Sequence, residues 1–189
     1  MSAPSESEWA TRMKRIDPQL AACGWLVEAC NPHGPPGACT HHALTEFPTA
    51  NGPADYALVV AGQPLGVVEA KKLTLGPQNA LTQAERYSKG VTDSPFNFRG
   101  YRVPFLYSTN GEVLWFHDVR RPLNRSRRIA AFHTPTALQE MLGKDFDAAC
   151  SWFSAHPNND PSLRPYQVEA NTAIEQAIID PESMGSFKP

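Results

Sequence analysis

The residues best placed to do chemistry lie in the segment ADYALVVAGQPLGVVEAKK, residues 54–72. Two apolar, β-branched runs flank Gly62, a pattern typical of a β-hairpin. If the hairpin is centred on Gly62, Asp55 lies opposite Glu69, with the two Cβ atoms about 4.5–5.5 Å apart. Because successive strand side chains alternate in direction, Glu69 and Lys71 project to the same side.

Two carboxylates at this separation repel each other and raise each other's proton affinity unless a cation lies between them. Magnesium takes oxygen ligands and keeps several waters, so the predicted ligands are Asp55, Glu69 and the backbone carbonyl of Ala70. Lys71 would then stabilise charge developing on a phosphate or help to deprotonate water. This pattern favours hydrolysis of a phosphodiester. The alternative is a surface ion pair at a strand end, without chemistry.

The flanking patterns predict the elements that position these residues. Ser5 and Glu8 form a capping box for a helix whose apolar positions are Trp9, Met13, Ile16 and Leu20. A second helix is predicted over residues 77–89, and Asn110-Gly111 is a strong hairpin turn signal. Capped helices follow at Thr134-Pro135 and in DFDAACSWF. This order indicates an α/β or α+β domain with a mixed sheet between helices, and we adopt the α/β class.

Asp55 followed by Glu69-Ala70-Lys71 resembles the PD-(D/E)XK nuclease signature. The longer segment 54–72 is similar to the N-terminal nuclease domain of type I restriction enzyme R subunits. SEWATRMKRIDPQLAACGW resembles the opening helix of that family, and STNGEVLWF resembles its downstream strand pair. The resemblance covers about residues 6–142 and implies a restriction-endonuclease-like mixed β-sheet flanked by helices.

The resemblance also implies further site residues. QAERY supplies Gln83 and Tyr87, which match the Q-x3-Y element that lies beside the metal centre in the family. Glu8 is expected to approach the metal from the first helix, although the capping box already explains its presence. Glu46 stands where the family often has an acidic residue in the preceding strand, and we assign it no role.

The family implies cleavage of double-stranded DNA with Mg²⁺, in a complex with methyltransferase and specificity subunits. The predicted domains are a PD-(D/E)XK endonuclease domain (1–155), a linker (156–163) and the start of a helicase-like motor (164–189). LRPYQVEANTAI resembles the beginning of that motor, but the chain contains no G-x4-G-K-[ST] sequence. ATP is therefore expected to bind only in a motor domain missing from this chain.

Five arginines cluster in the segment VRRPLNRSRR. They are Arg120, Arg121, Arg125, Arg127 and Arg128. They indicate either a solvated surface or an edge that contacts DNA phosphates. Cys30, His33, Cys39 and His41 or His42 allow a zinc site, but the Pro- and Gly-rich spacing favours a surface loop.

Composition limits the class of protein. Hydrophobic residues make up 41% of the chain and charged residues 19%, which excludes disorder. The net charge of -2 excludes binding to nucleic acid by bulk charge alone. The sequence predicts neither a membrane span nor a secretory signal, so we expect a cytoplasmic protein. Two rivals remain: a silent nuclease-fold module that binds DNA or docks subunits, and a RecB-like repair nuclease.

Overall fold

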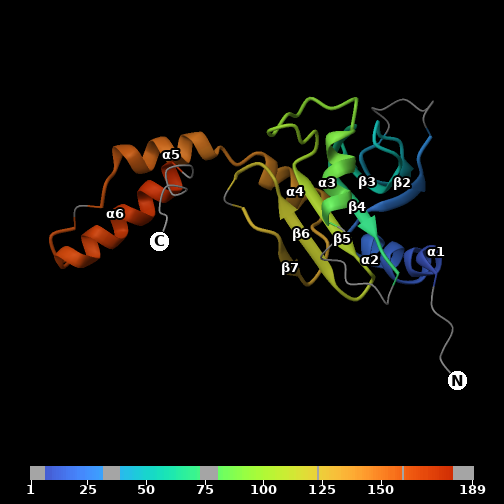
Figure 1. Cartoon of the computed structure of the whole chain (residues 1–189), viewed down its shortest axis with the longest axis horizontal. Helices are drawn as coiled ribbons and strands as arrows, with labels where there is room; N and C mark the ends of the chain where they lie inside the picture. Colours follow the sequence, from blue (N-terminus) through green and yellow to red (C-terminus); the bar gives the residue numbers. More distant parts are fainter. Residues whose placement is uncertain (1–6, 32–38, 73–80, 123, 159, 181–189) are drawn as a thin grey trace, which may run out of the picture. The chain divides into compact units, whose positions relative to one another are not determined.

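The computed structural model describes residues 7–31, 39–72, 81–122, 124–158 and 160–180. Its centre is a seven-stranded sheet in which the strands lie side by side in chain order (Figure 1). The β1–β2 and β4–β5 pairs are parallel, and the other four pairs are antiparallel. The strands are β1 (Leu26–Ala29), β2 (His41–Phe47), β3 (Ala54–Val60), β4 (Gln63–Ala70), β5 (Phe105–Thr109), β6 (Leu114–Asp118) and β7 (Arg127–Ile129).

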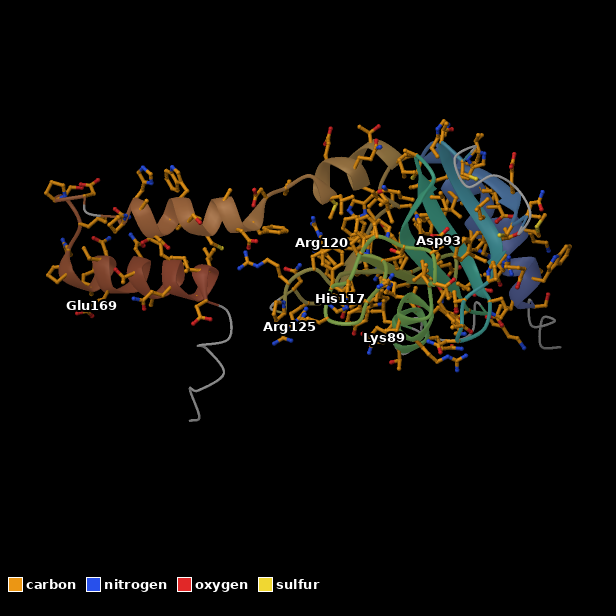
Figure 2. All side chains as sticks on the ribbon, turned by 90° about the horizontal axis from the view of Figure 1, so that it is seen from above. Lys89, Asp93, His117, Arg120, Arg125 and Glu169 are labelled. Carbon is orange, nitrogen blue, oxygen red and sulfur yellow. The ribbon has the colours of Figure 1, made fainter. Side chains whose placement is uncertain are left out.

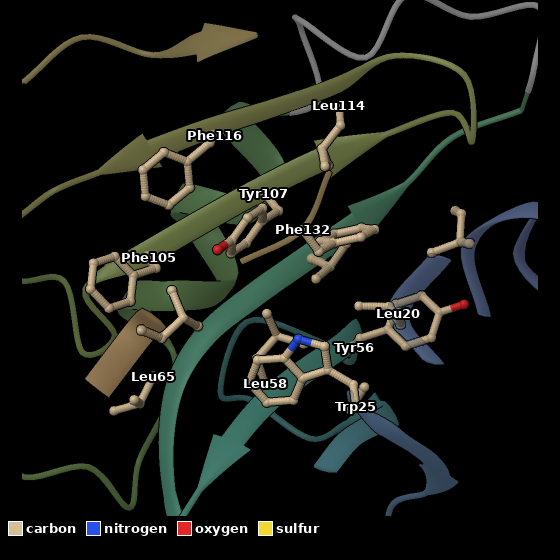
Figure 3. Packing of buried hydrophobic residues seen from close by; sticks show 14 of the residues in the cluster. Leu20, Trp25, Tyr56, Leu58, Leu65, Phe105, Tyr107, Leu114, Phe116 and Phe132 are labelled. Carbon is tan, nitrogen blue, oxygen red and sulfur yellow. The ribbon is translucent and has the colours of Figure 1, made fainter. Parts of the chain in front are cut away.

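Helices cover both faces of this sheet. They are α1 (Glu8–Thr11), η1 (Arg12–Ile16), α2 (Asp17–Ala22), α3 (Leu81–Lys89) and α4 (Pro135–Leu142). Ile16, Leu20 and Leu138 pack into one apolar cluster with Tyr56 and Phe116, so the N-terminal helix and α4 lie on one face. Figure 3 shows Leu20, Tyr56 and Phe116 in this cluster. Leu81 and Ala84 of α3 pack into a second cluster with Val67 and Leu106. The mixed sheet flanked by helices confirms the predicted α/β class.

The β3–β4 hairpin occupies the middle of the sheet, and nearly all of its residues are buried. Its turn is tight: Val60 pairs with Gln63, and Ala61 and Gly62 both have positive φ, as a type I′ turn requires. The register then shifts at a β-bulge, since Val59 pairs with Pro64 but Leu58 pairs with Gly66. A bulge also accommodates Pro64, which has no N–H to donate to the ladder.

The bulge determines which residues face each other at the far end of the hairpin. Beyond it, Ala57 pairs with Val67 and Tyr56 with Val68, as the sequence predicts. Extending this register sets Asp55 opposite Glu69. Without the extra residue in β4, the two-residue turn would move every later pair by one position and turn the facing side chains to opposite faces.

The N-terminal helix differs from the prediction in its cap and in its apolar face. Ser7 is the cap, and its Oγ accepts a hydrogen bond from the Ala10 N–H at 3.2 Å. The predicted cap, Ser5, lies outside the described residues. Because α1 begins at Glu8, this carboxylate is in the first helical position and the predicted capping box is wrong.

The predicted apolar stripe is broken by the π-helical turn η1, where the Asp17 N–H donates to the Arg12 carbonyl five residues back. A π turn adds a residue to the helical repeat and rotates the side chains that precede it. Ile16 and Leu20 are buried as predicted, but 69% of Trp9 and 51% of Met13 are exposed. The same rotation directs Arg12 toward the sheet, over the Tyr56 ring.

The predicted second hairpin is confirmed as β5–β6, in which the Asn110 side chain accepts hydrogen bonds from the N–H groups of Glu112 and Val113. The helix predicted over 77–89 is observed from Leu81 onward, and its residues 77–80 lie outside the described part. None of the helices in the described part of the chain combines the length and apolar character needed to cross a bilayer.

By compactness the chain divides into residues 1–142 and 143–189. The second unit contains α5 (Phe146–Ala155) and α6 (Pro165–Ile179), which pack against each other. The sequence interpretation placed α5 in the first domain, through residue 155, and put a linker at 156–163. These functional boundaries stay a prediction.

The turn geometry makes a test of stability possible. The left-handed backbone conformation costs residues other than Gly, Asn or Asp about 1–2 kcal/mol of conformational free energy. Ala61 has this conformation, with φ 49°. We expect Ala61→Asn to raise the free energy of unfolding by about 1 kcal/mol and Ala61→Val to lower it by at least as much. Urea unfolding checks the order Asn, Ala, Val; any other order contradicts this turn.

Candidate active site

Three carboxylates from separate elements meet at the end of the central hairpin. Glu8 comes from the first position of α1, Asp55 from β3 and Glu69 from β4. One ligand oxygen of each lies within 4.8 Å of the others. The structure therefore brings together all three predicted carboxylates, and their role as metal ligands stays a prediction.

The hairpin holds Asp55 in place through the backbone of β4. The Ala70 N–H donates to Asp55 Oδ2 at 2.7 Å, just beyond the last backbone pair of β3 and β4. A side-chain oxygen thus takes the position of a carbonyl at the end of the ladder. Ala70 is the residue whose carbonyl is the predicted third ligand, and that role stays a prediction.

Lys71 completes the cluster. Its ammonium Nζ lies 2.6 Å from Glu69 Oε1 and 3.7 Å from Glu8 Oε1. The side chains of Glu69 and Lys71 therefore project to the same side of the sheet, as strand alternation predicts. Burial lowers the pKa of Lys71, but the hydrogen bond to Glu69 and the nearby carboxylates outweigh burial and raise it. The ammonium is charged at neutral pH.

The pKa values of Asp55 and Glu69 are both raised above their ordinary values. Burial raises the pKa of Asp55, although the Ala70 N–H and Arg12 act in the opposite direction. Burial raises the pKa of Glu69 to about 7, opposed by its hydrogen bond to Lys71. Only 5% of the Glu69 side chain is exposed. Crowding of buried negative charge costs free energy, which a cation would relieve.

The cluster has the composition of a site for a hard divalent cation. Glu8, Asp55 and Glu69 supply oxygen ligands, and Arg12 pairs with both Asp55 and Glu46. The four carboxylates, with Lys71 and Arg12, leave an excess of two negative charges when all are ionised. One divalent cation would balance that excess, so these residues fit magnesium.

Gln83 and Tyr87 lie on α3 and are both half-buried. Within the described residues, neither forms a hydrogen bond or an ion pair with the three carboxylates. Tyr87 packs against the second apolar cluster, which contains Leu81 and Ala84 of α3. The Arg86 guanidinium lies 5.1 Å from the centre of the Tyr87 ring. The structure thus places this pair on the helix that follows β4 but does not join it to the acidic cluster.

The predicted arginine cluster is not a single surface. Arg120 donates to both carboxylate oxygens of Asp118, at 2.9 and 2.7 Å, and also to the Met141 carbonyl. Only 5% of its side chain is exposed, so a phosphate could reach it only by breaking these bonds. Arg121 is half-buried, whereas Arg125 is exposed (Figure 2).

The two arginines of β7 are also separated. Arg127 pairs with Phe116 and lies over its ring, and Arg128 pairs with Trp115. Because adjacent strand residues alternate faces, these two exposed side chains leave the sheet in opposite directions. DNA contact by Arg125, Arg127 and Arg128 stays a prediction, and the zinc alternative does too, since His33 lies outside the described residues.

Sequence reasoning missed Arg12, which the structure places against Asp55. Its only signal was the Thr11-Arg12 pair in the opening helix of the family resemblance. The helical periodicity could not reveal it, because η1 changes the direction in which Arg12 points. Glu46, left unassigned from the sequence, forms an ion pair with Arg12.

Comparisons with known proteins show the family of this chain. Residues 33–142, more than half of the chain, match the family model of the second domain of the type I restriction enzyme EcoKI endonuclease subunit. The chain therefore belongs to this family of type I restriction enzyme subunit domains, which confirms the resemblance. Asp55, Glu69 and Lys71 lie inside the matched region, and Glu8 and Arg12 lie outside it.

The EcoKI endonuclease subunit of Escherichia coli strain K12 is 29% identical over 213 aligned residues. The alignment covers 87% of this chain but only 18% of that relative's length. A solved fragment described as an HsdR subunit of a type I restriction enzyme from Vibrio vulnificus YJ016 has a TM-score of 0.49 and 22% identity. It covers 93% of this chain and 33% of that chain.

The raised pKa of Glu69 predicts how stability depends on pH without added metal. The unfolded carboxyl loses its proton near the ordinary value of 4.5, and the folded one near 7. The contribution of Glu69 to the free energy of unfolding is therefore largest below about pH 4.5 and is lost as the pH rises through 7. We expect the stability of wild type relative to Glu69→Gln to fall between pH 4.5 and 8. Urea unfolding in EDTA measures this difference, and a difference that does not change with pH contradicts the assignment.

The buried pair of Arg120 and Asp118 gives a second prediction. Arg120→Ala leaves the Asp118 carboxylate buried without its bidentate partner, which should cost about 3–5 kcal/mol in the free energy of unfolding. Arg125→Ala, at an exposed position of the same segment, should change it by less than about 0.5 kcal/mol. Similar urea-unfolding curves for the two variants would show that Arg120 does not have this structural role.

Proposed function

We propose that this domain is a magnesium-dependent endonuclease that hydrolyses phosphodiester bonds of double-stranded DNA. The observation that carries the proposal is the meeting of Glu8, Asp55 and Glu69 within 4.8 Å beside the Lys71 ammonium. A partly buried carboxylate cluster, with Glu69 almost fully buried and a cation beside it, is costly to maintain in a domain without chemistry. This cost favours an active nuclease over a silent DNA-binding or docking module.

The chain's own residues have separable roles in this proposal. Asp55 and Glu69, with Glu8, would hold the magnesium ion, which when bound supplies Lewis-acid stabilisation of charge on the phosphate. Asp55 is oriented for this role by the Ala70 N–H. Lys71 places a positive charge beside Glu69, where it would stabilise negative charge that develops on the phosphate oxygens.

The reaction is a displacement by water. The water oxygen loses a proton as it forms a bond to phosphorus, the P–O bond to one sugar oxygen breaks, and the leaving oxygen gains a proton. The fixed ammonium of Lys71 lowers the barrier by stabilising the extra charge of the transition state more than that of the ground state. Gln83 and Tyr87, on the helix after β4, would contact DNA or position catalytic groups.

The family relationship supports the wider biological proposal. The relative from Escherichia coli is named as an endonuclease subunit of a type I restriction enzyme, and this chain spans a small part of its length. We infer that the domain acts in the cytoplasm as part of an R subunit, together with specificity and methyltransferase subunits. DNA sequence choice would then belong to the specificity subunit, and ATP would act only in the motor domain of the whole R subunit.

Substitutions at the hairpin test the nuclease directly. Asp55→Ala and Lys71→Ala in the full-length protein, assembled with its partner subunits, should each abolish plasmid cleavage by removing a ligand or the charge at the phosphate. ATPase activity should stay close to wild type, and both variants should remain folded. Lys72→Ala is the matched control, because Lys72 is the exposed neighbour that projects to the other side.

The outcomes separate the rival functions. Cleavage that survives in both variants would rule out this active site. Absence of cleavage in the assembled wild-type enzyme, with ATPase activity present, would favour the silent module.

A further inference from the structure

Arg12 occupies a position beside the carboxylate cluster that the proposed reaction does not use. Only 13% of its side chain is exposed, although it belongs to a surface helix. One guanidinium nitrogen donates to Asp55 Oδ1 and another to the Asp55 backbone carbonyl, both at 3.3 Å. The guanidinium thus contacts both the side chain and the backbone of Asp55.

Arg12 is itself fixed from the side of the helix. The centre of its guanidinium lies 4.8 Å from the centroid of the buried Tyr56 ring, and its Nε lies 3.4 Å from the Tyr56 hydroxyl. That hydroxyl in turn donates to Asp17 Oδ1 at 2.6 Å. Tyr56 and Asp17 therefore hold the guanidinium above the start of β3, and little freedom is left to it.

Glu46 fixes Arg12 from the opposite side. Thr45 pairs with Tyr56 and Phe47 with Ala54, which sets Glu46 opposite Asp55 on the neighbouring strand. Glu46 has φ 52°, a left-handed conformation that costs a non-glycine residue about 1–3 kcal/mol. Its carboxylate forms a charge-assisted hydrogen bond with Arg12. This contact offsets strain that a regular β2 strand would not have.

The two oxygens of Asp55 then have different partners. Oδ2 accepts from the Ala70 N–H of β4, and Oδ1 accepts from Arg12 of the helix. These two donors fix the rotation of the carboxylate, and each oxygen keeps lone-pair capacity for another partner. Groups that hold a ligating carboxylate in this way typically change metal affinity or activity by about 10–100-fold when removed.

We propose that Arg12 is a positioning residue that orients the Asp55 carboxylate, and that Glu46 holds Arg12 in place for this task. The role of Asp55 as a ligand rests on the proposed function, but its orientation by Arg12 does not. Arg12 touches neither phosphate nor water in this role. It acts through Asp55.

The Ala70 amide reports this orientation without metal or DNA. Its hydrogen bond to Asp55 Oδ2 should weaken when Asp55 loses its second anchor, whereas the neighbouring Lys71 amide, bonded to the Thr109 carbonyl at 2.8 Å, should not respond. We expect Arg12→Ala and Glu46→Gln to make hydrogen exchange of the Ala70 amide at least about tenfold faster. Asp55→Ala gives the upper limit. NMR exchange in EDTA measures both amides in one sample.

Two further variants separate positioning from a general loss of structure. Arg15→Ala is the matched control, because Arg15 lies on the same helix but pairs with Glu112. In Arg15→Ala, the Ala70 amide should exchange at the wild-type rate. Arg12→Lys keeps the charge but not the planar fork, so protection of the Ala70 amide should return only in part.

Unchanged exchange of the Ala70 amide in both Arg12→Ala and Glu46→Gln would overturn the proposal. Equal acceleration at Ala70 and Lys71 would also overturn it, because the loss would then be that of the whole strand end. In the assembled enzyme, Arg12→Ala should lower the cleavage rate about 10–100-fold, with partial recovery in Arg12→Lys. If wild type itself does not cleave, the proposed function fails, and the exchange result alone decides the role of Arg12.

Discussion

The register of the central hairpin is the constraint on which the site depends. With the tight turn at Ala61-Gly62 alone, Asp55 would not pair with Glu69. The bulge between Leu58 and Val59 shifts the register by one residue and restores this pairing. The correction places two carboxylates opposite each other at the end of buried strands. The rest of the sheet supports that arrangement, since β2 and β5 flank the hairpin and helices cover both faces.

The charges around the hairpin are divided between two cations. Lys71 contacts Glu69 and Glu8, and Arg12 contacts Asp55 and Glu46. This division keeps four carboxylates within one small region, where unrelieved repulsion would otherwise favour protonation. An excess of negative charge remains at the end of the hairpin that is opposite its turn. The N-terminal helix is therefore part of the site as well as a cover for the sheet.

The strand patterns predict much of the fold because their signals are local. Alternating apolar runs, Gly62 and Asn110-Gly111 are enough to predict both hairpins. The predicted pairing of Asp55 with Glu69 is right, but it depends on the bulge between Leu58 and Val59, which the sequence did not reveal. The N-terminal helix was predicted less well, since the spacing of Trp9, Met13, Ile16 and Leu20 carries no signal of the π turn at η1. A count of charges along the sequence also could not show that Arg120 is bound by Asp118 and by the Met141 carbonyl, 21 residues away.

The central claim is that the carboxylates at the end of the hairpin bind a divalent cation. Its most direct test is a calorimetric titration of Mg²⁺ and Mn²⁺ into this chain and into Glu69→Ala, repeated with a short DNA duplex present. We predict that wild type binds one ion, at least when DNA is present, and that Glu69→Ala binds none with or without DNA. Equal binding by the two proteins, or no binding by wild type even with DNA, would contradict the account.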